Sequence, residues 1–318
     1  MQERIKLIAV VGPTASGKSE LAVFLARYIK KSNLGGYQGA EIISADSRQI
    51  YKYLDVGTNK VPGKWQKRIF MYKNIPHYCI DFVHPKKTFT AAEYKTCAEQ
   101  AISEIVQRGH IPILVGGTGF YIQAVVDGIT LPEVSPNLKF RKRLEKKSAE
   151  ELFVMLQKLD PNRAVSIDAK NPRRLIRAIE IATALGKVPV IKKQSPYDVL
   201  LIGIKKPDTE LKAAIAERSK KQIPGLIKEI KLLRKLKIPQ KRIRELGFEY
   251  RLALAHLEAE LPSLLGRPVS KLELAHMLTR ENWRYVKRQM TWFKKDKRIC
   301  LITTKKDAER LVRTFLKN

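Results

Sequence analysis

Cysteine is scarce in this 318-residue sequence, which contains only three: Cys79, Cys97 and Cys300. They are odd in number, lie far apart in the chain and form no C-x-x-C pair. This pattern argues against a disulfide framework and against a cysteine-ligated zinc site.

Long apolar segments are also lacking. No run approaches the roughly 20 residues that a helix needs to cross a bilayer. The apolar residues near the N-terminus continue into a glycine-containing segment at Gly12 rather than into a small-residue cleavage site, so we predict no signal peptide. We therefore expect a cytoplasmic protein that does not enter a membrane.

Acidic residues are few, with 31 Asp and Glu against 62 Lys and Arg and a formal net charge of +31. This excess favours a polyanionic partner such as nucleic acid or a membrane surface, although a generally basic host proteome would give the same balance. The hydrophobic content of 44% and aromatic content of 8% indicate a globular chain. Its length suggests one large domain or two ordinary ones.

The strongest motif is a phosphate-binding loop of the pattern G-x-x-x-x-G-K-[ST]. An apolar run at residues 5–11 precedes it and a helical pattern at 20–29 follows it, which is the strand–loop–helix context that the motif requires. Its glycines let backbone N–H groups converge on a phosphate, Lys18 supplies a full charge, and the Ser19 hydroxyl can hold Mg²⁺. The motif indicates phosphate binding without specifying ATP. Its residues are Gly12, Pro13, Thr14, Ala15, Ser16, Gly17, Lys18 and Ser19.

Short apolar runs alternate with helical patterns after this loop. An amphipathic helix is predicted at residues 90–108, with a capping box between Thr90 and Glu93. Residues 64–73 are basic and look irregular. The repeated strand–helix order predicts an α/β fold, with a parallel sheet of the P-loop NTPase kind flanked by helices. The additional strands are predicted at 41–45, 77–82 and 111–115.

The pattern changes near Ile129. Helices but no strand are predicted in the stretch that follows, until an apolar run at 199–204 returns to the sheet. We therefore predict a catalytic core formed by residues 1–130 and 198–318, and an inserted all-helical domain at 131–197 that is dense in Lys and Arg. Insertion helices are predicted at 137–147, 149–158 and 171–185. Later elements are helices at 209–220, 225–236, 240–257, 271–293 and 307–316, and a strand at 299–302.

Polar residues follow several predicted strands at their carboxyl ends, where open α/β sheets bind ligands. Residues 46–49 and 116–118 are two such segments, and with the phosphate loop they can converge on one crevice. Asp81 ends another predicted strand. It is compatible with a Walker-B-like Mg²⁺ carboxylate or with a carboxylate that caps a turn, and the sequence leaves both open.

An ordered set of segments resembles the tRNA dimethylallyltransferase family, in its prokaryotic form because the C-terminal zinc finger of eukaryotic members is absent. The similarity covers nearly the whole chain. Each segment alone is weak or moderate evidence, whereas the ordered set is specific. The segments are residues 12–19, 43–51, 56–58, 75–78, 115–121, 173–180 and 287–293.

The resemblance implies a particular reaction. The phosphate loop would hold the diphosphate of dimethylallyl diphosphate, and Lys18 and Arg218 would neutralise the leaving diphosphate. Asp46 would orient the N6 amine of the adenosine 3′ of the anticodon and take its proton. Thr118 would contact the bridging region of the diphosphate and the reacting adenosine. Ser19 would bind Mg²⁺.

The resemblance also implies contacts with tRNA, whose target base would have to be flipped out of the anticodon loop. Basic side chains suit such contacts because they clamp phosphates. The implied residues are Asp46, Ser47, Arg48, Gln49, Thr118, Lys139, Arg173, Arg174, Leu175, Ile176 and Arg177.

The chain departs from the family pattern at three places. Val61 stands where the family usually has Pro, so that loop is expected to be shifted. Lys139 replaces the usual Arg, which weakens a bidentate phosphate contact. Pro224 leads us to expect that the helix carrying Arg218 ends early.

Plainer roles exist for several of these residues. Asp46 could cap the next helix, Arg218 could be a solvated charge, and the Arg173–Arg177 segment could form an ordinary exposed face. Gln289 and Trp292 are expected to pack rather than to catalyse.

Three alternative functions remain. They are an adenylate isopentenyltransferase acting on free AMP, an ATP-dependent small-molecule kinase with a P-loop, and a non-catalytic basic RNA-binding protein. The basic insertion argues against the first, because a small nucleotide does not need it. We expect a monomer whose partners are tRNA and dimethylallyl diphosphate.

Overall fold

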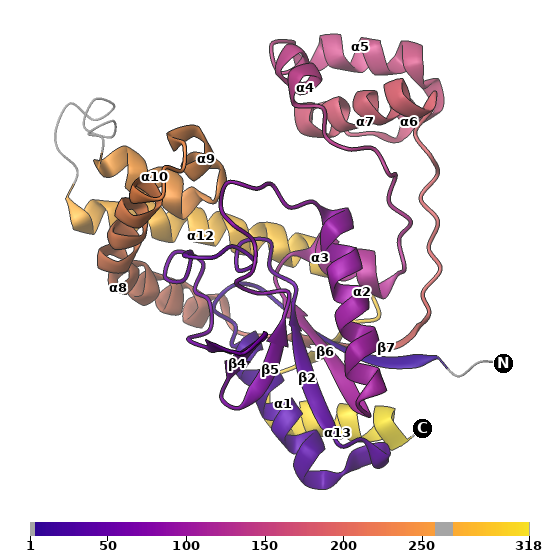
Figure 1. Ribbon diagram of the computed structural model, residues 1–318, viewed down its shortest axis with the longest axis vertical. Helices are drawn as coiled ribbons and strands as arrows, with labels where there is room; N and C mark the ends of the chain where they lie inside the picture. The colour runs from indigo at the N-terminus through magenta and orange to yellow at the C-terminus, as the bar shows by residue number, and fades with distance from the viewer. Residues whose placement is uncertain (1–3, 258–269, 318) are drawn as a thin grey trace. The chain divides into compact units, whose positions relative to one another are not determined.

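The computed structural model describes residues 4–257 and 270–317 (Figure 1). In these residues eight strands form one sheet in the order β3-β4-β5-β2-β6-β1-β7-β8. The neighbouring strands from β5 through β2, β6, β1 and β7 to β8 pair in parallel, whereas β4 is antiparallel to both of its neighbours, β3 and β5. The strands are β1 (Ile5–Val11), β2 (Gly39–Ser44), β3 (Lys64–Gln66), β4 (Ile69–Tyr72), β5 (Ile75–Tyr78), β6 (His110–Gly116), β7 (Tyr197–Ile204) and β8 (Cys300–Ile302).

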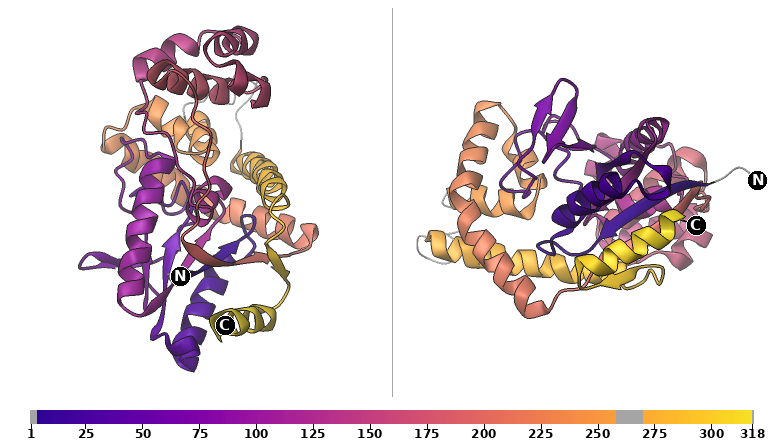
Figure 2. Two further views of the ribbon diagram at one scale, coloured as in Figure 1. Left: turned by 90° about the vertical axis from the view of Figure 1, so that its right-hand side faces the viewer. Right: turned by 90° about the horizontal axis from the view of Figure 1, so that it is seen from below.

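The predicted α/β fold with a mostly parallel sheet is confirmed, because both faces of the sheet are covered by helices. Alternate residues of β1 point into two separate hydrophobic cores. Ile8 and Val10 belong to the first core, and Leu7 and Val11 belong to the second. The first core is closed by α1 (Lys18–Ser32) and α13 (Lys305–Lys317), which lie side by side in Figure 2. The second is closed by α2 (Ala91–Gln107) and α3 (Gly119–Val126). Burial on both faces explains why the central strands are continuously apolar.

A third core joins the remaining helices of this unit to the loop that follows β2. Buried side chains from these helices surround Ile50 and Leu54 of that loop. The helices therefore hold the loop beyond the carboxyl end of β2 in place. They are α8 (Asp208–Lys235), α9 (Gln240–Glu245), α10 (Phe248–Leu257) and α12 (Lys271–Phe293).

The chain forms two compact units. One comprises residues up to Asp127 and from Ser195 onward, and the other comprises Gly128–Gln194. The second unit contains α4 (Leu138–Leu144), α5 (Ala149–Leu159), α6 (Pro161–Ser166) and α7 (Pro172–Leu185) around a core that includes Leu152, Leu156 and Ile179. It overlaps the predicted insertion at 131–197, and α6 is a helix that the sequence did not predict.

The predicted break at Pro224 is wrong, because α8 is one helix of 28 residues that passes through this proline. Proline inside a helix costs about 3 kcal/mol. Ile223, Leu226 and Ile230 are buried on either side of it, and burying an aliphatic side chain contributes about 1.5–3 kcal/mol each. Tertiary packing therefore offsets the local penalty.

Two other local predictions are also corrected. Residues 64–73 form the β3–β4 hairpin rather than an irregular segment, because Phe70 is buried and anchors the hairpin to β5. The predicted helix at 240–257 is split at Gly247 into α9 and α10.

All three cysteines are free, with the Sγ atoms of Cys79 and Cys97 2.7 Å apart. No helix in the described ranges is both long and apolar enough to cross a membrane.

Candidate active site

The phosphate loop connects β1 to α1 in a tightly wound conformation. Gly12, Ala15 and Gly17 all have positive φ, of 148°, 63° and 90°. Ala15 is strained in this region, and such strain concentrates at ligand sites. The N-cap of α1 is Gly17, which offers no side-chain cap, so the first-turn amides of α1 are left to bind an anion.

Several donors at this loop are suited to an anion. The hydroxyl of Ser16 and Nε of Arg218 are buried and have no hydrogen-bond partner among the described residues. Burial lowers the pKa of Lys18 to about 8, although Asp46 partly raises it and Arg218 lowers it further. Buried donors without partners are costly, and a diphosphate would satisfy them.

Arg218 is fixed at the loop rather than solvated. Its Nη1 donates to Thr14 Oγ1 over 2.8 Å, and its Nη2 donates to Oδ1 of Asn282 on α12 over 2.6 Å. Burial lowers the pKa of Arg218, while Glu249 and Asp46 act in the opposite direction. α8 therefore carries a positive charge directly to the phosphate loop.

Gln289 joins two of the three strand-end loops. Its Oε1 accepts from Thr14 N over 2.9 Å, and its Nε2 donates to Gly117 O over 2.9 Å. The sequence suggested only a packing role for this residue. A buried glutamine on α12 is a weak signal, and only the fold shows that it positions both loops.

The glycine at the end of β6 allows a close backbone approach. A Cβ on Gly116 would lie 2.0 Å from the carbonyl oxygen of Ala45, in backbone that cannot move aside cheaply. We expect Gly116→Ala to lower the free energy of unfolding by about 2 kcal/mol or more, as measured by urea denaturation. The control is Gly39→Ala in β2, where the nearest atom would be 3.7 Å away. Equal effects of the two substitutions would contradict this account.

Asp46 follows β2 and has a fixed orientation. Its Oδ1 accepts from the backbone N–H groups of Arg48, at 2.8 Å, and Gln49, at 3.3 Å. It therefore caps a local turn, and not a helix as its plainer role would require. No described residue donates to Oδ2, so the same carboxylate retains an oxygen that can accept a proton.

Thr118 links the loop after β6 to the Asp46 segment. Its Oγ1 accepts from Ser47 N over 3.0 Å, and its own N–H donates to Ala45 O over 3.2 Å. Burial raises the pKa of Tyr285 on α12, and the nearby Asp46 raises it further. Thr118, Asp46 and the phosphate loop thus meet at one edge of the sheet.

Glu249 at the start of α10 lies near Arg218 and Asp46, and this proximity was not predicted from the sequence. Burial raises the pKa of Glu249 to about 7, although Arg218 and Arg48 lower it and Asp46 raises it. No local motif indicated this residue. It enters the site because α10 packs against α8 and α12.

Asp81 fits neither of its two predicted roles. It lies beyond β5, which ends at Tyr78, and both of its oxygens are engaged by side chains. Oδ1 pairs with Lys60 Nζ at 2.6 Å, and Oδ2 accepts from Trp65 Nε1 at 2.8 Å. The described residues contain no cluster of three His, Cys, Asp or Glu side chains that could hold a metal ion.

The remaining predicted residues of the catalytic unit lie on the Asp46 segment. Arg48 is exposed, and its Nη1 donates to Glu245 O over 2.9 Å. Gln49 Nε2 donates to the carbonyl oxygens of Thr58 and Asn59. These bonds hold the segment against α9 and against the 56–60 loop.

In the inserted unit, Lys139, Arg173 and Arg174 are exposed. Arg177 is half-buried and pairs with Glu180, which Arg141 also contacts. Among the residues predicted to contact tRNA, exposed basic side chains therefore occur both on the Asp46 segment, at Arg48, and in the inserted unit. Leu175 and Ile176 are buried in the core of this unit, and the N–H of Leu175 donates to Asn171 O at the start of α7.

Comparisons with known proteins agree on one family. The family profile described as IPP transferase matches residues 49–296, which begin after the phosphate loop. The tRNA dimethylallyltransferase of Halothermothrix orenii is 38% identical over 92% of this chain and 86% of its own. The structure of the full-length tRNA isopentenylpyrophosphate transferase of Bacillus halodurans has a TM-score of 0.68 at 30% identity, over 98% and 97% of the two chains.

A structure of a eukaryotic dimethylallyltransferase acting on tRNA has a TM-score of 0.67 at 25% identity and covers 94% of this chain and 74% of its own. The similarity thus extends over almost all of the chain in both sequence and structure. This chain belongs to the IPP transferase family.

Proposed function

We propose that this protein transfers a dimethylallyl group from dimethylallyl diphosphate to N6 of the adenosine on the 3′ side of the tRNA anticodon. The observation that carries the proposal is the joining of three loops at one edge of the sheet. Gln289 ties the phosphate loop to Gly117, and Thr118 hydrogen-bonds to the segment that holds Asp46. A diphosphate site and a candidate base therefore share one crevice.

The diphosphate is held by the phosphate loop, residues 12–19. Lys18 and Arg218 supply the charge that stabilises the leaving diphosphate, and the amides at the start of α1 add hydrogen bonds. The Ser19 hydroxyl would hold Mg²⁺, which would supply positive charge to the diphosphate. Because Thr14 Oγ1 and Asn282 fix its guanidinium, Arg218 is pre-positioned for this task.

The acceptor adenosine lies at Asp46 and Thr118. The N6 lone pair attacks the allylic C1, a new N–C bond forms, the C1–O bond breaks, and diphosphate leaves. Asp46 takes the proton that N6 loses, while the Thr118 hydroxyl orients the reacting groups. Two backbone hydrogen bonds to Asp46 Oδ1 hold the carboxylate in one orientation.

When the adenosine is bound in the site, the neighbouring nucleotides of the tRNA also contact the protein. Ser47, Arg48 and Gln49 lie on the segment that carries the base and contact the nucleotides beside it. The inserted unit contributes Lys139, Arg173, Arg174 and Arg177, and the buried Leu175 and Ile176 anchor the helix that carries the three arginines. The formal net charge of +31 supports binding of a polyanion such as tRNA.

The direct test is incubation of the purified protein with an anticodon stem-loop RNA, dimethylallyl diphosphate and Mg²⁺, followed by nucleoside mass spectrometry. We expect isopentenyladenosine in the RNA. Parallel reactions contain AMP, or ATP with small-molecule acceptors. Prenylation of AMP in preference to RNA, or ADP release without prenylation, would replace the proposal by one of its rivals.

We also propose that a cytoplasmic monomer carries out the reaction. Light scattering of the purified protein is expected to give the mass of a single chain, 36.4 kDa. A larger mass at assay concentration would contradict this.

The pKa of about 8 for Lys18 predicts a pH dependence of diphosphate binding. The charged amine binds diphosphate, and it is lost as the pH rises through 8. Above about pH 8 we therefore expect kcat/KM for dimethylallyl diphosphate to fall about tenfold per pH unit. A Lys18→Arg variant keeps its charge throughout, so it should not show this fall. A wild-type profile that is flat to pH 9.5 would contradict the prediction.

A further inference from the structure

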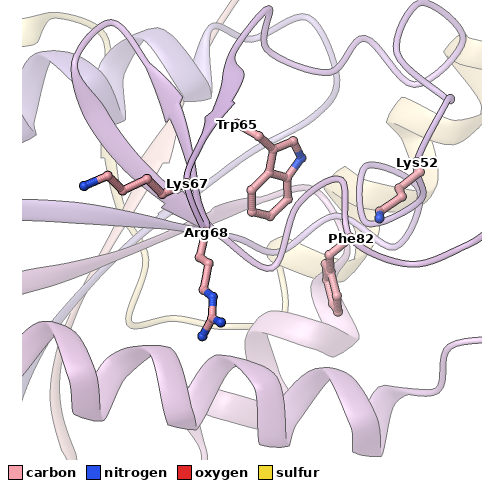
Figure 3. A pocket seen from close by; sticks show the side chains of 5 residues that line it. All are labelled: Lys52, Trp65, Lys67, Arg68 and Phe82. Atoms are coloured by element: carbon pink, nitrogen blue, oxygen red, sulfur yellow. The ribbon is translucent and has the colours of Figure 1, made fainter.

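A basic pocket with an aromatic floor lies beside the β3–β4 hairpin, outside the crevice described above. Its volume is about 330 Å³, and its lining residues are Lys52, Trp65, Lys67, Arg68 and Phe82. Figure 3 shows the indole of Trp65 between Lys67 and Arg68 on its own hairpin and Lys52 and Phe82 on the neighbouring loops. Three cationic residues and two aromatic residues line this pocket, and no acidic side chain does.

Trp65 is held in place although much of it faces solvent. The residue is 44% exposed. Its Nε1 donates to Asp81 Oδ2 over 2.8 Å, and its ring makes an edge-to-face contact with Phe70, with centroids 5.9 Å apart. An exposed indole that is fixed in this way can stack on a ligand with little further loss of entropy.

The carboxylate that holds Trp65 is itself anchored by a buried lysine. The Lys60 side chain is 2% exposed, and its Nζ lies 2.6 Å from Asp81 Oδ1. The same Nζ donates to Tyr51 O over 2.8 Å and to Asp55 Oδ1 over 2.7 Å. Lys60 thus balances one of the two carboxylates that it contacts, and the three cations that line the pocket outweigh the negative charge that remains.

The pocket is attached to the segment that carries Asp46. Asp81 N donates to Gln49 O, Phe82 N donates to Ile50 O, and Lys52 N donates to Val83 O, each over 2.9 Å. Lys52 and Asp46 therefore lie on one segment, which is fixed to the loop after β5. A ligand that spans from Asp46 along this segment would reach the pocket.

We propose that this pocket binds an unpaired nucleotide of the RNA substrate, near the one that is modified, with its base stacked on Trp65. Lys52, Lys67 and Arg68 contact the adjoining phosphates. Single-stranded nucleic acid is commonly bound by aromatic platforms inside positively charged grooves. The inference rests on the proposed function, because the continuity of the pocket with Asp46 matters only if RNA is the substrate.

The test compares RNA binding by substituted full-length proteins, measured by fluorescence anisotropy with a labelled anticodon stem-loop. Trp65→Leu keeps apolar cover over Phe70 but removes the stacking face, and we expect Kd to rise about tenfold. Trp65→Phe keeps a stacking face and is expected to recover most of the affinity. Lys67→Gln with Arg68→Gln should flatten the slope of log Kd against log salt by about 1.5, which corresponds to about two phosphate contacts.

The matched control is Lys30→Gln with Lys31→Gln. These exposed lysines end α1, at the end of that helix away from the phosphate loop, and their loss should change Kd less than twofold. KM for dimethylallyl diphosphate is measured for every variant and should change less than twofold. Unchanged RNA affinity in Trp65→Leu, or equal losses in the control pair, would overturn the inference.

Two further arms separate the possible outcomes. Binding of AMP that depends on Trp65 as strongly as RNA binding does would assign the pocket to free nucleotides and overturn the proposal. The anisotropy measurement does not depend on turnover. A wild-type protein that binds RNA through Trp65 but forms no isopentenyladenosine would therefore contradict the proposed reaction and leave the RNA contact standing.

Discussion

Replacing Asp46 by Asn is expected to lower kcat for tRNA prenylation about 10³-fold, within the range that a positioned general base contributes. The change removes the charge and the basic oxygen. It keeps an oxygen that can accept from Arg48 N and Gln49 N, the two bonds that now orient Oδ1. The loss should therefore be chemical rather than conformational.

Single-turnover prenylation with saturating RNA and dimethylallyl diphosphate measures this effect. Kd values for both substrates should change by less than about threefold, because the turn is retained. Asp198→Asn is the matched control. Asp198 is half-exposed at the other end of the sheet, and its ion pair with Lys6 is long at 3.7 Å. An Asp46→Asn variant that keeps more than a tenth of the wild-type rate would rule out Asp46 as the base.

Replacing Glu229 by Ala is expected to lower the free energy of unfolding by about 3–5 kcal/mol, because several buried hydrogen-bond donors lose their acceptor. Glu229 is 8% exposed on α8. Its carboxylate accepts from the backbone N–H groups of Asp55, Val56 and Gly57 at 2.5–3.0 Å. It also accepts from the hydroxyl of Tyr250 at 2.7 Å.

The substitution leaves three amides and a hydroxyl without their acceptor, and each buried unsatisfied group costs about 1–3 kcal/mol. Thermal unfolding should show a fall of roughly 10 °C in Tm for a protein of this size. Glu229→Gln keeps one acceptor oxygen and should lose about half as much. Glu217→Ala, on the same helix but exposed and paired only with Lys221, is expected to change Tm by less than about 2 °C.

The Glu229 contact also bears on the site. The loop that it holds continues to Thr58 and Asn59, whose carbonyl oxygens accept from Gln49. Equal stability losses in Glu229→Ala and Glu217→Ala would show that the loop finds other partners. In that case the third core alone would hold the Asp46 segment.

The sequence alone could predict the features that depend on residues close together in the chain. The apolar runs of β1, β2 and β6 predicted buried parallel strands, because a strand covered on both faces needs no polar side. Thr90 and Glu93 predicted the start of α2, and the structure has the complete capping box there. The phosphate loop could be identified for the same reason, since its residue types act over neighbouring positions. The family resemblance, which depends on ordered segments, is confirmed by the relatives.

Contacts between residues far apart in the chain decided the rest. Pro224 stays helical because buried neighbours offset its local cost, and the β3–β4 hairpin forms around Phe70 despite a highly charged sequence. Gln289 reaches Thr14 and Gly117 across more than 170 positions of sequence. Local propensity carries no information about such pairings. Only tertiary packing could therefore bring Gln289 and Arg218 to the phosphate loop and Glu249 to their vicinity. The hydrogen bond from Trp65 to the Asp81 carboxylate likewise depends on the fold.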